Sequence, residues 1–368
     1  MTYGPAILAT PTYRGIRTVK AGVTMTGTVI DRQVLDSAVE LACRAPSVHN
    51  SQPWRWVAEG GELRLFFDPQ RIPHATDLTG REAAISCGAV LDHLRVAAAA
   101  AGWHATAARF PNPNDLNHLA TIHFSPLHFV TDAVRARAEA ILHRRTDRLP
   151  FGAPSSFPAF EPVLRSTIDT DKATLTVLPE SARPHLAQAS KLTESLRRYD
   201  SSYHAELQWW TAPSTAGDRM PRSALVSTSE RDRVDIARSF PADEHPDRRP
   251  GVDRDQSVIA VLSTHGDSRR DALGCGEVLS DVLLEATLAG LATCTLSHMT
   301  ELKDSRNVIR ELIGDSGNPQ LLIRIGEVPA QSNQPPGDQP PGDQPPATPR
   351  RPLSEVLQSR GPTGGGRP

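Results

Sequence analysis

The chain has 368 residues, with 40 Lys and Arg against 42 Asp and Glu, so its formal charge of −2 argues against a dedicated nucleic-acid binder. Four cysteines are too few for a disulfide scaffold, and the longest apolar run, Val96 to Gly102, is far short of the roughly 20 residues that span a bilayer. No secretory signal is visible, so we expect a cytoplasmic protein without a membrane or nucleic-acid partner.

The first predicted element is a helix that begins after the N-cap candidate Asp31 and ends before Pro46, with apolar residues at helical spacing between them. A polar loop and a β-hairpin with the turn Glu59-Gly60-Gly61-Glu62 follow. The elements predicted from there on are strands over Trp54–Ala58 and Leu63–Phe67, a helix over Arg81–Ala101, a strand over Leu119–Phe124 and a helix over Asp132–His143.

Two segments that lie 188 residues apart resemble each other. Cys87-Gly88 and Cys275-Gly276 each stand early in an Ala-rich helical pattern, and Gly102 and Gly290 each follow fifteen positions after the cysteine. A β-like run comes after each copy, Leu119 to Phe124 after the first and Leu321 to Ile325 after the second. This echo indicates duplication of an α+β unit, and the alternative is chance similarity between Ala-rich helices.

Prolines and charges divide the rest of the chain. Residues 211–256 carry five prolines and two glycines that interrupt any regular pattern, and they read as a lid-like insertion. Residues 334–346 read QPPGDQPPGDQPP, which predicts an extended linker without a core. We expect an unstructured or non-native extension over 1–27, a first half over 28–130, a second half over 131–330, a Pro-rich linker over 331–349 and a basic tail over 350–368.

The first segment that suggests a function is the polar loop Ala45–Trp54, which two prolines bracket. Ser47, His49 and Asn50 supply hydrogen-bond donors and acceptors there, and Trp56 lies in the strand that follows. A flat heteroaromatic ligand needs hydrogen bonds at its edge and apolar packing on its face. The alternative is a capped loop whose polar groups satisfy one another.

The second such segment is the basic cluster at the end of the helix over Asp132–His143. Arg144, Arg145 and Arg148 offer bidentate, charge-assisted hydrogen bonds, and Thr146 offers a hydroxyl, so the cluster can hold a phosphate dianion. The alternative is a solvated helix end at which cations interact with the helix dipole.

Other catalytic signatures are absent from the sequence. It contains no GxSxG, P-loop or HExxH motif, and its 13 histidines show no metal-ligand spacing. Gly274-Cys275-Gly276 begins like a dinucleotide fingerprint, but Leu279 stands where the third glycine belongs. We therefore expect no metal and no side-chain nucleophile.

Taken together, the segments resemble the FMN-dependent nitroreductase family and its fused, Acg-like branch. Residues 43–54, CRAPSVHNSQPW, look like the family's APSxxNxQPW signature. Residues 143–151, HRRTDRLPF, look like its RRSxRxF phosphate motif, with Thr146 in place of the usual Ser. Residues 290–298, GLATCTLSH, look like the loop whose backbone faces the flavin edge, and 350–356, RRPLSEV, look like the C-terminal basic element.

This resemblance implies an α+β fold that is duplicated within the chain, each half a mixed or antiparallel sheet flanked by helices. Family dimers build each FMN site from two subunits, and here the two halves of one chain would take their places. The implied cofactor-binding residues are Pro46, Ser47, His49, Asn50, Arg144, Arg145, Thr146, Arg148, Ser297, His298, Arg350 and Arg351.

The reciprocal site of such a pseudo-dimer looks broken. The segment Tyr13–Thr18 gives no convincing phosphate motif, and residues 199–207 have lost the APSxxN pattern. We therefore expect one FMN per chain, in a monomer.

The resemblance implies hydride transfer from NAD(P)H through FMN to a nitroaromatic or quinone-like small molecule, with the chemistry carried by the flavin. The long 211–256 segment keeps a second hypothesis open, in which it covers the flavin and the protein stores or sequesters FMN. A flavin-free scaffold is the third.

Overall fold

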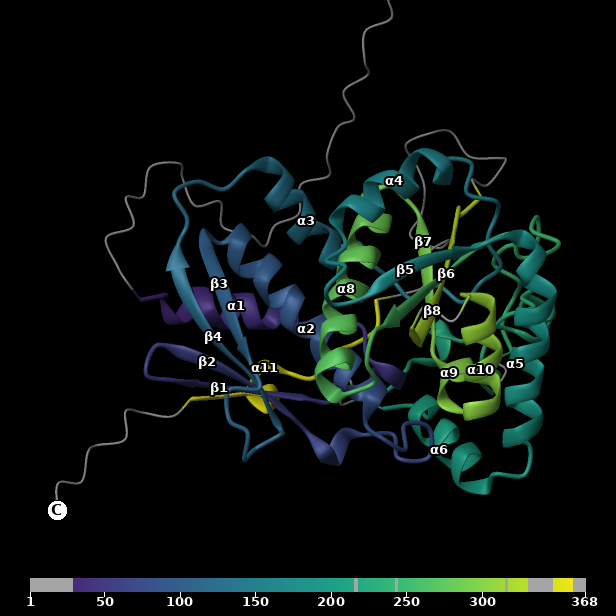
Figure 1. Ribbon diagram of the computed structural model, residues 1–368, viewed down its shortest axis with the longest axis horizontal. Coiled ribbons are helices and arrows are strands. Elements are labelled where there is room, and N and C mark those ends of the chain that lie inside the picture. The colour runs from purple at the N-terminus through teal and green to yellow at the C-terminus, as the bar shows by residue number, and fades with distance from the viewer. Residues whose placement is uncertain (1–28, 215–217, 242–243, 315–316, 330–346, 360–368) are drawn as a thin grey trace, which may run out of the picture.

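The computed structural model describes residues 29–214, 218–241, 244–314, 317–329 and 347–359. The predictions for residues 1–27, for most of the linker 331–349 and for residues 360–368 of the tail lie outside these ranges. The rest forms two sheets with helices around and between them, so the α+β class is confirmed (Figure 1).

The first sheet has the strand order β3-β4-β2-β1-β9. Its hairpin strands are β1 (Trp54–Glu59) and β2 (Glu62–Phe67), and β3 (Trp103–Arg109) and β4 (His118–Pro126) follow. Gly60 and Gly61 turn the hairpin with φ of 61° and 86°, the left-handed region that glycine adopts without strain. The strand over Leu119–Phe124 and both hairpin strands are thus confirmed, whereas β3 has no counterpart among the predicted elements.

The C-terminal segment returns to this first sheet. After the short helix α11 (Leu353–Val356), strand β9 (Leu357–Ser359) pairs parallel with β1, and Trp56 lies opposite Leu357. The last described residues therefore lie against the first half of the chain, which we call the first unit (Figure 1). They do not lie against the second half, the second unit, although it directly precedes them in the sequence.

The second sheet has the order β5-β6-β8-β7, which repeats the order β1-β2-β4-β3 of the first. Its strands are antiparallel throughout, and both β2 against β4 and β6 against β8 carry one register shift. The predicted β-like run Leu321–Ile325 lies inside β8. The strand bounds are β5 Thr174–Leu178, β6 Val258–Thr264, β7 Ala292–Leu296 and β8 Asn318–Gly326.

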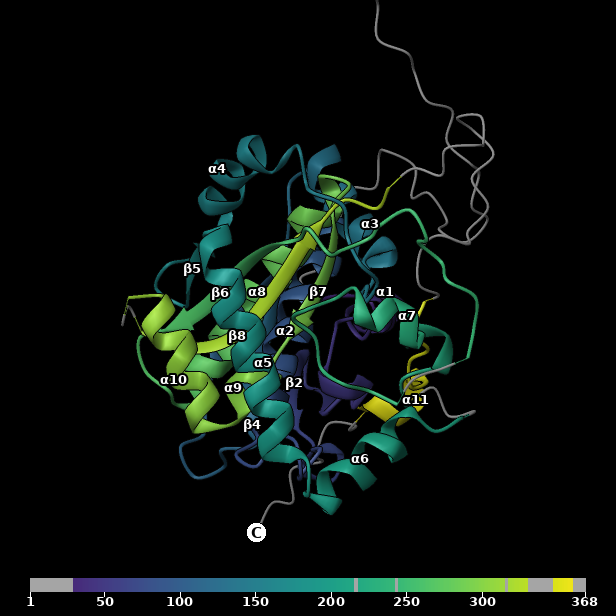
Figure 2. The same cartoon turned by 90° about the vertical axis from the view of Figure 1, so that its right-hand side faces the viewer.

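Alternate residues of β6 face two different cores. Ala260 and Leu262 point into the central core that is shared with α8 (Arg269–Leu288), whereas Ile259 and Val261 point into a second core. Figure 2 shows helices on that second face of the sheet. They are α5 (Arg183–Arg197), α9 (His298–Glu301) and α10 (Lys303–Leu312).

The centre of the molecule is the contact between α2 (Arg81–Ala100) and α8, which are each 20 residues long and offset by 188. A Cβ on Gly88 would lie 2.0 Å from the carbonyl oxygen of Leu273, so only glycine permits this approach. By length and apolar composition α2 is the one described helix that could cross a membrane, but 83% of its most apolar window is buried, so the protein core explains that composition.

The remaining helices frame these layers. The first helix begins at its N-cap Asp31, whose side chain accepts from the backbone N–H of Gln33. The predicted counterpart of the polar loop, residues 199–207, falls largely in α6. The helix bounds are α1 Arg32–Ala42, α3 Asp132–His143, α4 Phe157–Thr167, α6 Ser201–Thr211 and α7 Thr228–Asp232.

Candidate functional site

The polar loop after α1 has a strained backbone. His49, Asn50 and Gln52 adopt φ of 51°, 61° and 50°, and these are three of the four non-glycine residues with positive φ in the described ranges. Such conformations persist only where surrounding contacts impose them, and they concentrate at ligand sites. Ser47 contributes one such contact, because its Oγ accepts from the N–H of Gln52 at 3.0 Å.

The side chains of this loop have definite partners. His49 is 6% exposed, and its Nε2 lies 3.2 Å from the Thr76 hydroxyl. Burial, with Arg238 and Arg148 nearby, holds the pKa of His49 well below 6.5, so its ring is neutral. The amide nitrogen of Asn50 donates to the carbonyl of Pro349, and its Oδ1 accepts from Arg350 at 2.9 Å. The loop is therefore bound to the C-terminal segment.

Helix α3 ends at His143 and delivers the basic cluster to the same place. A cavity of about 500 Å³ brings Arg144, Arg145, Thr146 and Arg148 together with loop residues from the first unit. Arg44 and Arg350 complete its basic lining. Residues about 100 and 300 positions apart in the sequence thus meet, as the resemblance implies. The other lining residues are Pro46, Ser47, Asn50, Ile141, Met220 and Thr348.

The five arginines of this cavity lack a balancing acid. In the described part of the chain none of them forms an ion pair with a carboxylate, and the Nε atoms of Arg44 and Arg144 are buried without a hydrogen-bond partner. Burial with Arg145 and Arg44 lowers the pKa of Arg144 to about 10. Burial with Arg144 and Arg44 lowers that of Arg350 to about 9. Uncompensated buried cations are costly, so the cavity fits a multivalent anion.

A larger cavity of about 1030 Å³ adjoins the first. Pro46, Ser47, Thr146 and Arg148 line both, so the two cavities share a wall, and we call them together the slot between the units. The walls of the larger cavity mix apolar and polar side chains, which suits a flat ring that carries hydrogen-bonding groups at its edge. They include Val48, His49, Glu82, Ile85, Ser86, Val226, Arg231, Val234, Ala237, Arg238, Phe240, Leu279, Cys294, Thr295, Leu296, Ser297, His298, Leu321 and Arg324.

The segment that was expected as a flavin-edge loop differs in form from that expectation. Residues 292–296 form strand β7, because β8 supplies a partner strand, and only Ser297 and His298 follow as the entry to α9. Both line the larger cavity. His298 is 3% exposed, its Nε2 lies 2.8 Å from the Ser190 hydroxyl, and burial with Arg238 nearby lowers its pKa well below 6.5.

The 211–256 segment forms part of the cavity wall. Arg148 lies under the Phe240 ring, with its guanidinium carbon 5.2 Å from the ring centroid, and the His49 ring meets Phe240 edge-on at 5.8 Å. The insertion is held to the basic motif by Arg249, which forms a buried ion pair of 2.5 Å with Asp147. One aromatic side chain of the insertion therefore contacts both units across the slot.

The two arginines of the C-terminal element have different positions. Arg350 donates to Asn50 and to the carbonyl oxygens of Cys43, Arg44 and Ala45, all at 3.2 Å or less. Arg351 lines neither cavity, and its Nε points to Glu355 at 3.2 Å. The backbone N–H of Arg351 still supports the loop, since it donates to Gln52 at 2.9 Å.

Several lining residues were not among the predicted site residues, and those with charged or aromatic side chains include Arg44, Glu82, Arg238 and Phe240. Arg44 directly precedes the APSVHN segment, so its charge beside that motif was a usable signal. Glu82, Arg238 and Phe240 carry no motif, and only the packing of α2 and the insertion against β7 brings them to the cavity.

No model of a protein family matches the chain. The Mycobacterium tuberculosis protein "Putative NAD(P)H nitroreductase acg" is 54% identical over 336 residues, which are 91% of this chain and 98% of that protein. "Uncharacterized protein Rv3127" of the same organism is 52% identical over 331 residues, 89% of this chain and 93% of that protein.

A solved structure, the FMN-dependent nitroreductase NfnB from Mycobacterium smegmatis in complex with NADPH, matches 62% of this chain and 99% of its own. Its TM-score is 0.36 at 19% identity, so we rest the assignment on the sequence relatives alone. With 54% identity to Acg over 98% of that protein, the chain belongs to the Acg family of nitroreductase-type oxidoreductases.

Proposed function

We propose that this protein binds FMN in the slot between its two units and transfers hydride from NAD(P)H through it to a nitroaromatic or quinone-like small molecule. The observation that carries this proposal is that the two cavities adjoin: one holds five arginines without an ion-pair partner among the described residues, and the other has mixed apolar and polar walls. A ligand with a dianionic phosphate at one end and a flat ring at the other matches both. The name of the relative Acg, a putative NAD(P)H nitroreductase, points to the same chemistry.

The residues have separate tasks in this proposal. Arg144, Arg145, Arg148, Arg44 and Arg350 neutralise the phosphate, and the Thr146 hydroxyl adds a donor. Ser47, His49 and Pro46 shape the wall of the ring cavity, while Asn50 fixes the loop to Arg350. Ser297 and His298 present the end of β7. When bound, FMN would supply the hydride chemistry, and these residues would bind it, orient it and exclude water.

We infer further that the chain is an internally duplicated pseudo-dimer with one site. The equal lengths and 188-residue offset of α2 and α8, with the repeated strand order, support duplication. In α8 the counterpart of Ser86 is Gly274, where the side chain of Lys172 lies 3.3 Å from the position of a Cβ. Lys172 itself pairs with the buried Glu277, so the reciprocal position is filled. We therefore propose one FMN per chain, in a monomer.

Comparison of FMN with riboflavin, which lacks the phosphate, tests this site. We expect tight binding of FMN and weak binding of riboflavin. Arg144→Ala should weaken FMN binding by about 1.5–3 kcal/mol, roughly 10- to 150-fold, and leave riboflavin affinity unchanged. Arg222→Ala, on an exposed arginine of the insertion, is the matched control. Equal affinities for both flavins in the wild-type protein would place the phosphate elsewhere.

FMN storage is a second candidate function, and the contact of Phe240 with both His49 and Arg148 favours it. If the insertion keeps the ring covered, a nicotinamide cannot stack on it. Stopped-flow mixing of the FMN-loaded protein with NADPH and with NADH separates the two functions. Rapid bleaching of the flavin supports the reductase, and its absence despite full reduction by dithionite supports storage.

A further inference from the structure

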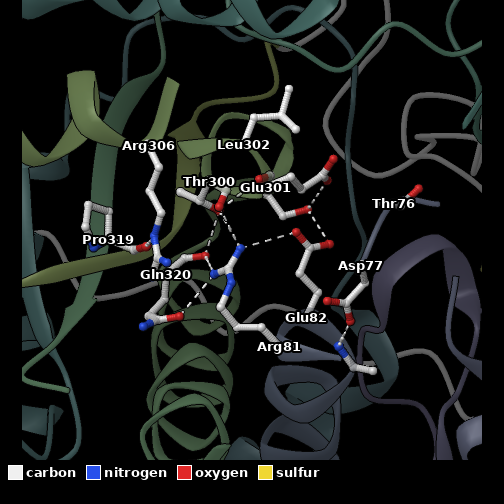
Figure 3. A network of polar contacts seen from close by, with 12 residues as sticks. Thr76, Asp77, Arg81, Glu82, Thr300, Glu301, Leu302, Arg306, Pro319 and Gln320 are labelled. Carbon is white, nitrogen blue, oxygen red and sulfur yellow. Dashed lines mark hydrogen bonds and ion pairs between the residues drawn. The ribbon is translucent and has the colours of Figure 1, made fainter. Parts of the chain in front are cut away.

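A cluster of buried carboxyl groups lies at the end of the larger cavity where Ser297 enters α9. Glu82 lines the cavity and is 4% exposed, and Glu301 behind it has a side chain only 1% exposed. The Ser297 hydroxyl lies 3.0 Å from Oε2 of Glu82 and 3.4 Å from Oε1 of Glu301. Figure 3 shows Glu82 between Arg81 and Glu301, with Asp77 beside it.

The positive charges near Glu82 and Glu301 are distributed unequally between these two carboxyl groups. Arg238 directs both terminal nitrogens to Glu301, which Arg197 approaches at 3.8 Å, so Glu301 is well neutralised. Glu82 has only a 3.5 Å contact with Arg81, whose guanidinium is committed to the carbonyl oxygens of Gln320 and Thr300.

The small number of hydrogen-bond donors also favours one proton held between Glu82 and Glu301. The single Ser297 proton can serve one carboxylate at a time, and Arg238 already donates to that hydroxyl at 3.1 Å. Burial, then Glu301 and then Asp77 raise the pKa of Glu82 well above 4.5. Groups that face Glu82 from the elements packed against it are Asp77, Arg81, Arg238, Ser297, His298 and Glu301.

We propose that Glu82 is a catalytic proton donor whose carboxyl group gives its proton to the electron acceptor in the cavity, and that Ser297, Glu301 and Arg238 are positioning residues for it. The inference rests on the proposed function, because it needs an acceptor in that cavity. The geometry supports it: Glu82 is the member of the pair that lines the cavity, and Glu301 lies one layer behind.

The chemistry balances for a quinone. Reduction to the hydroquinone adds two electrons and two hydrogens, of which one hydrogen arrives with both electrons as hydride from the reduced cofactor. The second is the proton that Glu82 releases from its carboxyl oxygen to a quinone oxygen. Glu82 is left as a carboxylate and takes up a proton from water after the product leaves, so no further reactant is needed.

Infrared spectroscopy tests whether Glu82 holds this proton, independently of turnover. The carbonyl stretch of a protonated carboxyl group should appear in the difference spectrum of wild-type protein minus Glu82→Gln near neutral pH. Glu301→Gln removes a neighbouring like charge, so it should make the band disappear at lower pH than in the wild type. Glu161→Gln, on the surface of α4, should leave the band unchanged.

Activity then tests whether the proton is used. We expect Glu82→Gln to lower the rate at which the dithionite-reduced holoprotein reduces a quinone by roughly 10²-fold or more, and to flatten its pH profile. FMN affinity should stay within about twofold of wild type.

The outcomes separate this inference from the function on which it rests. A protein that binds FMN and reduces quinones equally fast with Glu82→Gln overturns the proton donor and leaves the reductase standing. An infrared difference without the band overturns it as well. A protein that binds no FMN overturns the proposed function, and this inference with it.

Discussion

Gly88 of α2 and Gly276 of α8 face each other at the centre of the molecule, and the two residues are 188 positions apart. A Cβ built on either glycine lies 2.8 Å from the Cα of the other. A Cβ on Gly276 also lies 1.9 Å from the carbonyl oxygen of Ile85, as one on Gly88 lies 2.0 Å from that of Leu273. The helices that carry the repeated Cys-Gly pairs are thus the helices through which the two units contact each other.

Alanine at either position should force the two helices apart. We expect Gly88→Ala and Gly276→Ala each to lower the free energy of unfolding by about 3 kcal/mol or more, because backbone atoms cannot move aside as side chains do. Urea unfolding measures the change. Gly251→Ala, where a Cβ has open space, is the control and should stay near wild type. A loss of less than ~1 kcal/mol in both variants would contradict this contact.

Substitution of two adjacent arginines distinguishes the role of each. Arg350→Ala removes a cation from the phosphate cavity and the donor to Asn50, so FMN affinity should fall roughly 10- to 150-fold. Arg351→Ala should change it by less than about threefold, since that guanidinium points to Glu355. Fluorescence titration of each apoprotein with FMN gives both values. Equal losses of FMN affinity in the two variants would contradict the different positions of the two guanidinium groups.

Phe240 should control access to the ring cavity. Phe240→Ala removes the side chain that contacts both His49 and Arg148, so we expect FMN to dissociate at least about tenfold faster, with little change in stability. Dilution of the FMN-loaded protein into a large excess of flavin-free buffer, followed by flavin fluorescence, measures the dissociation rate. Leu196→Ala, on an exposed side chain of α5, is the control. An unchanged dissociation rate would show that the insertion does not retain the flavin.

The buried Glu82 should make stability depend on pH. Its pKa is raised in the folded protein, so as pH rises past 4.5 the unfolded chain releases this proton first and the folded chain keeps it. The free energy of unfolding therefore falls as pH rises, until the pKa in the folded state is passed. Glu82→Gln removes this contribution, so the decline that begins above about pH 4.5 should be shallower in the variant. Parallel declines would show that Glu82 is ionised.

Local pattern predicted the elements best where periodicity and caps agree. The helix over Arg81–Ala101, the hairpin around Gly60-Gly61 and the helix over Asp132–His143 agree with the structure within one or two residues. Strand β7 was missed because a five-residue run has no period long enough to separate it from a loop, and only pairing with β8 forms it.

The residues of the candidate site likewise fall into those that the sequence identified and those that it could not. Arg144 to Arg148 and Ser47 to Asn50 were identified from their residue types and the family resemblance, and the structure brings these segments to one slot. Glu82 and Phe240 could not be identified, because an ordinary helix position and an irregular loop give no signal until tertiary packing places them. The direction of the Arg351 side chain could not be predicted either, because it depends on the ion pair with Glu355, four residues further along the chain.

The central claim is that one chain builds one complete cofactor site between its two units. Titration of the apoprotein with FMN, followed by flavin fluorescence and checked by absorbance of the washed complex, tests this. We expect saturation at one FMN per chain, with occupancy lost in Arg144→Ala at the same concentrations. Saturation at two FMN per chain, or at one per pair of chains, would contradict it.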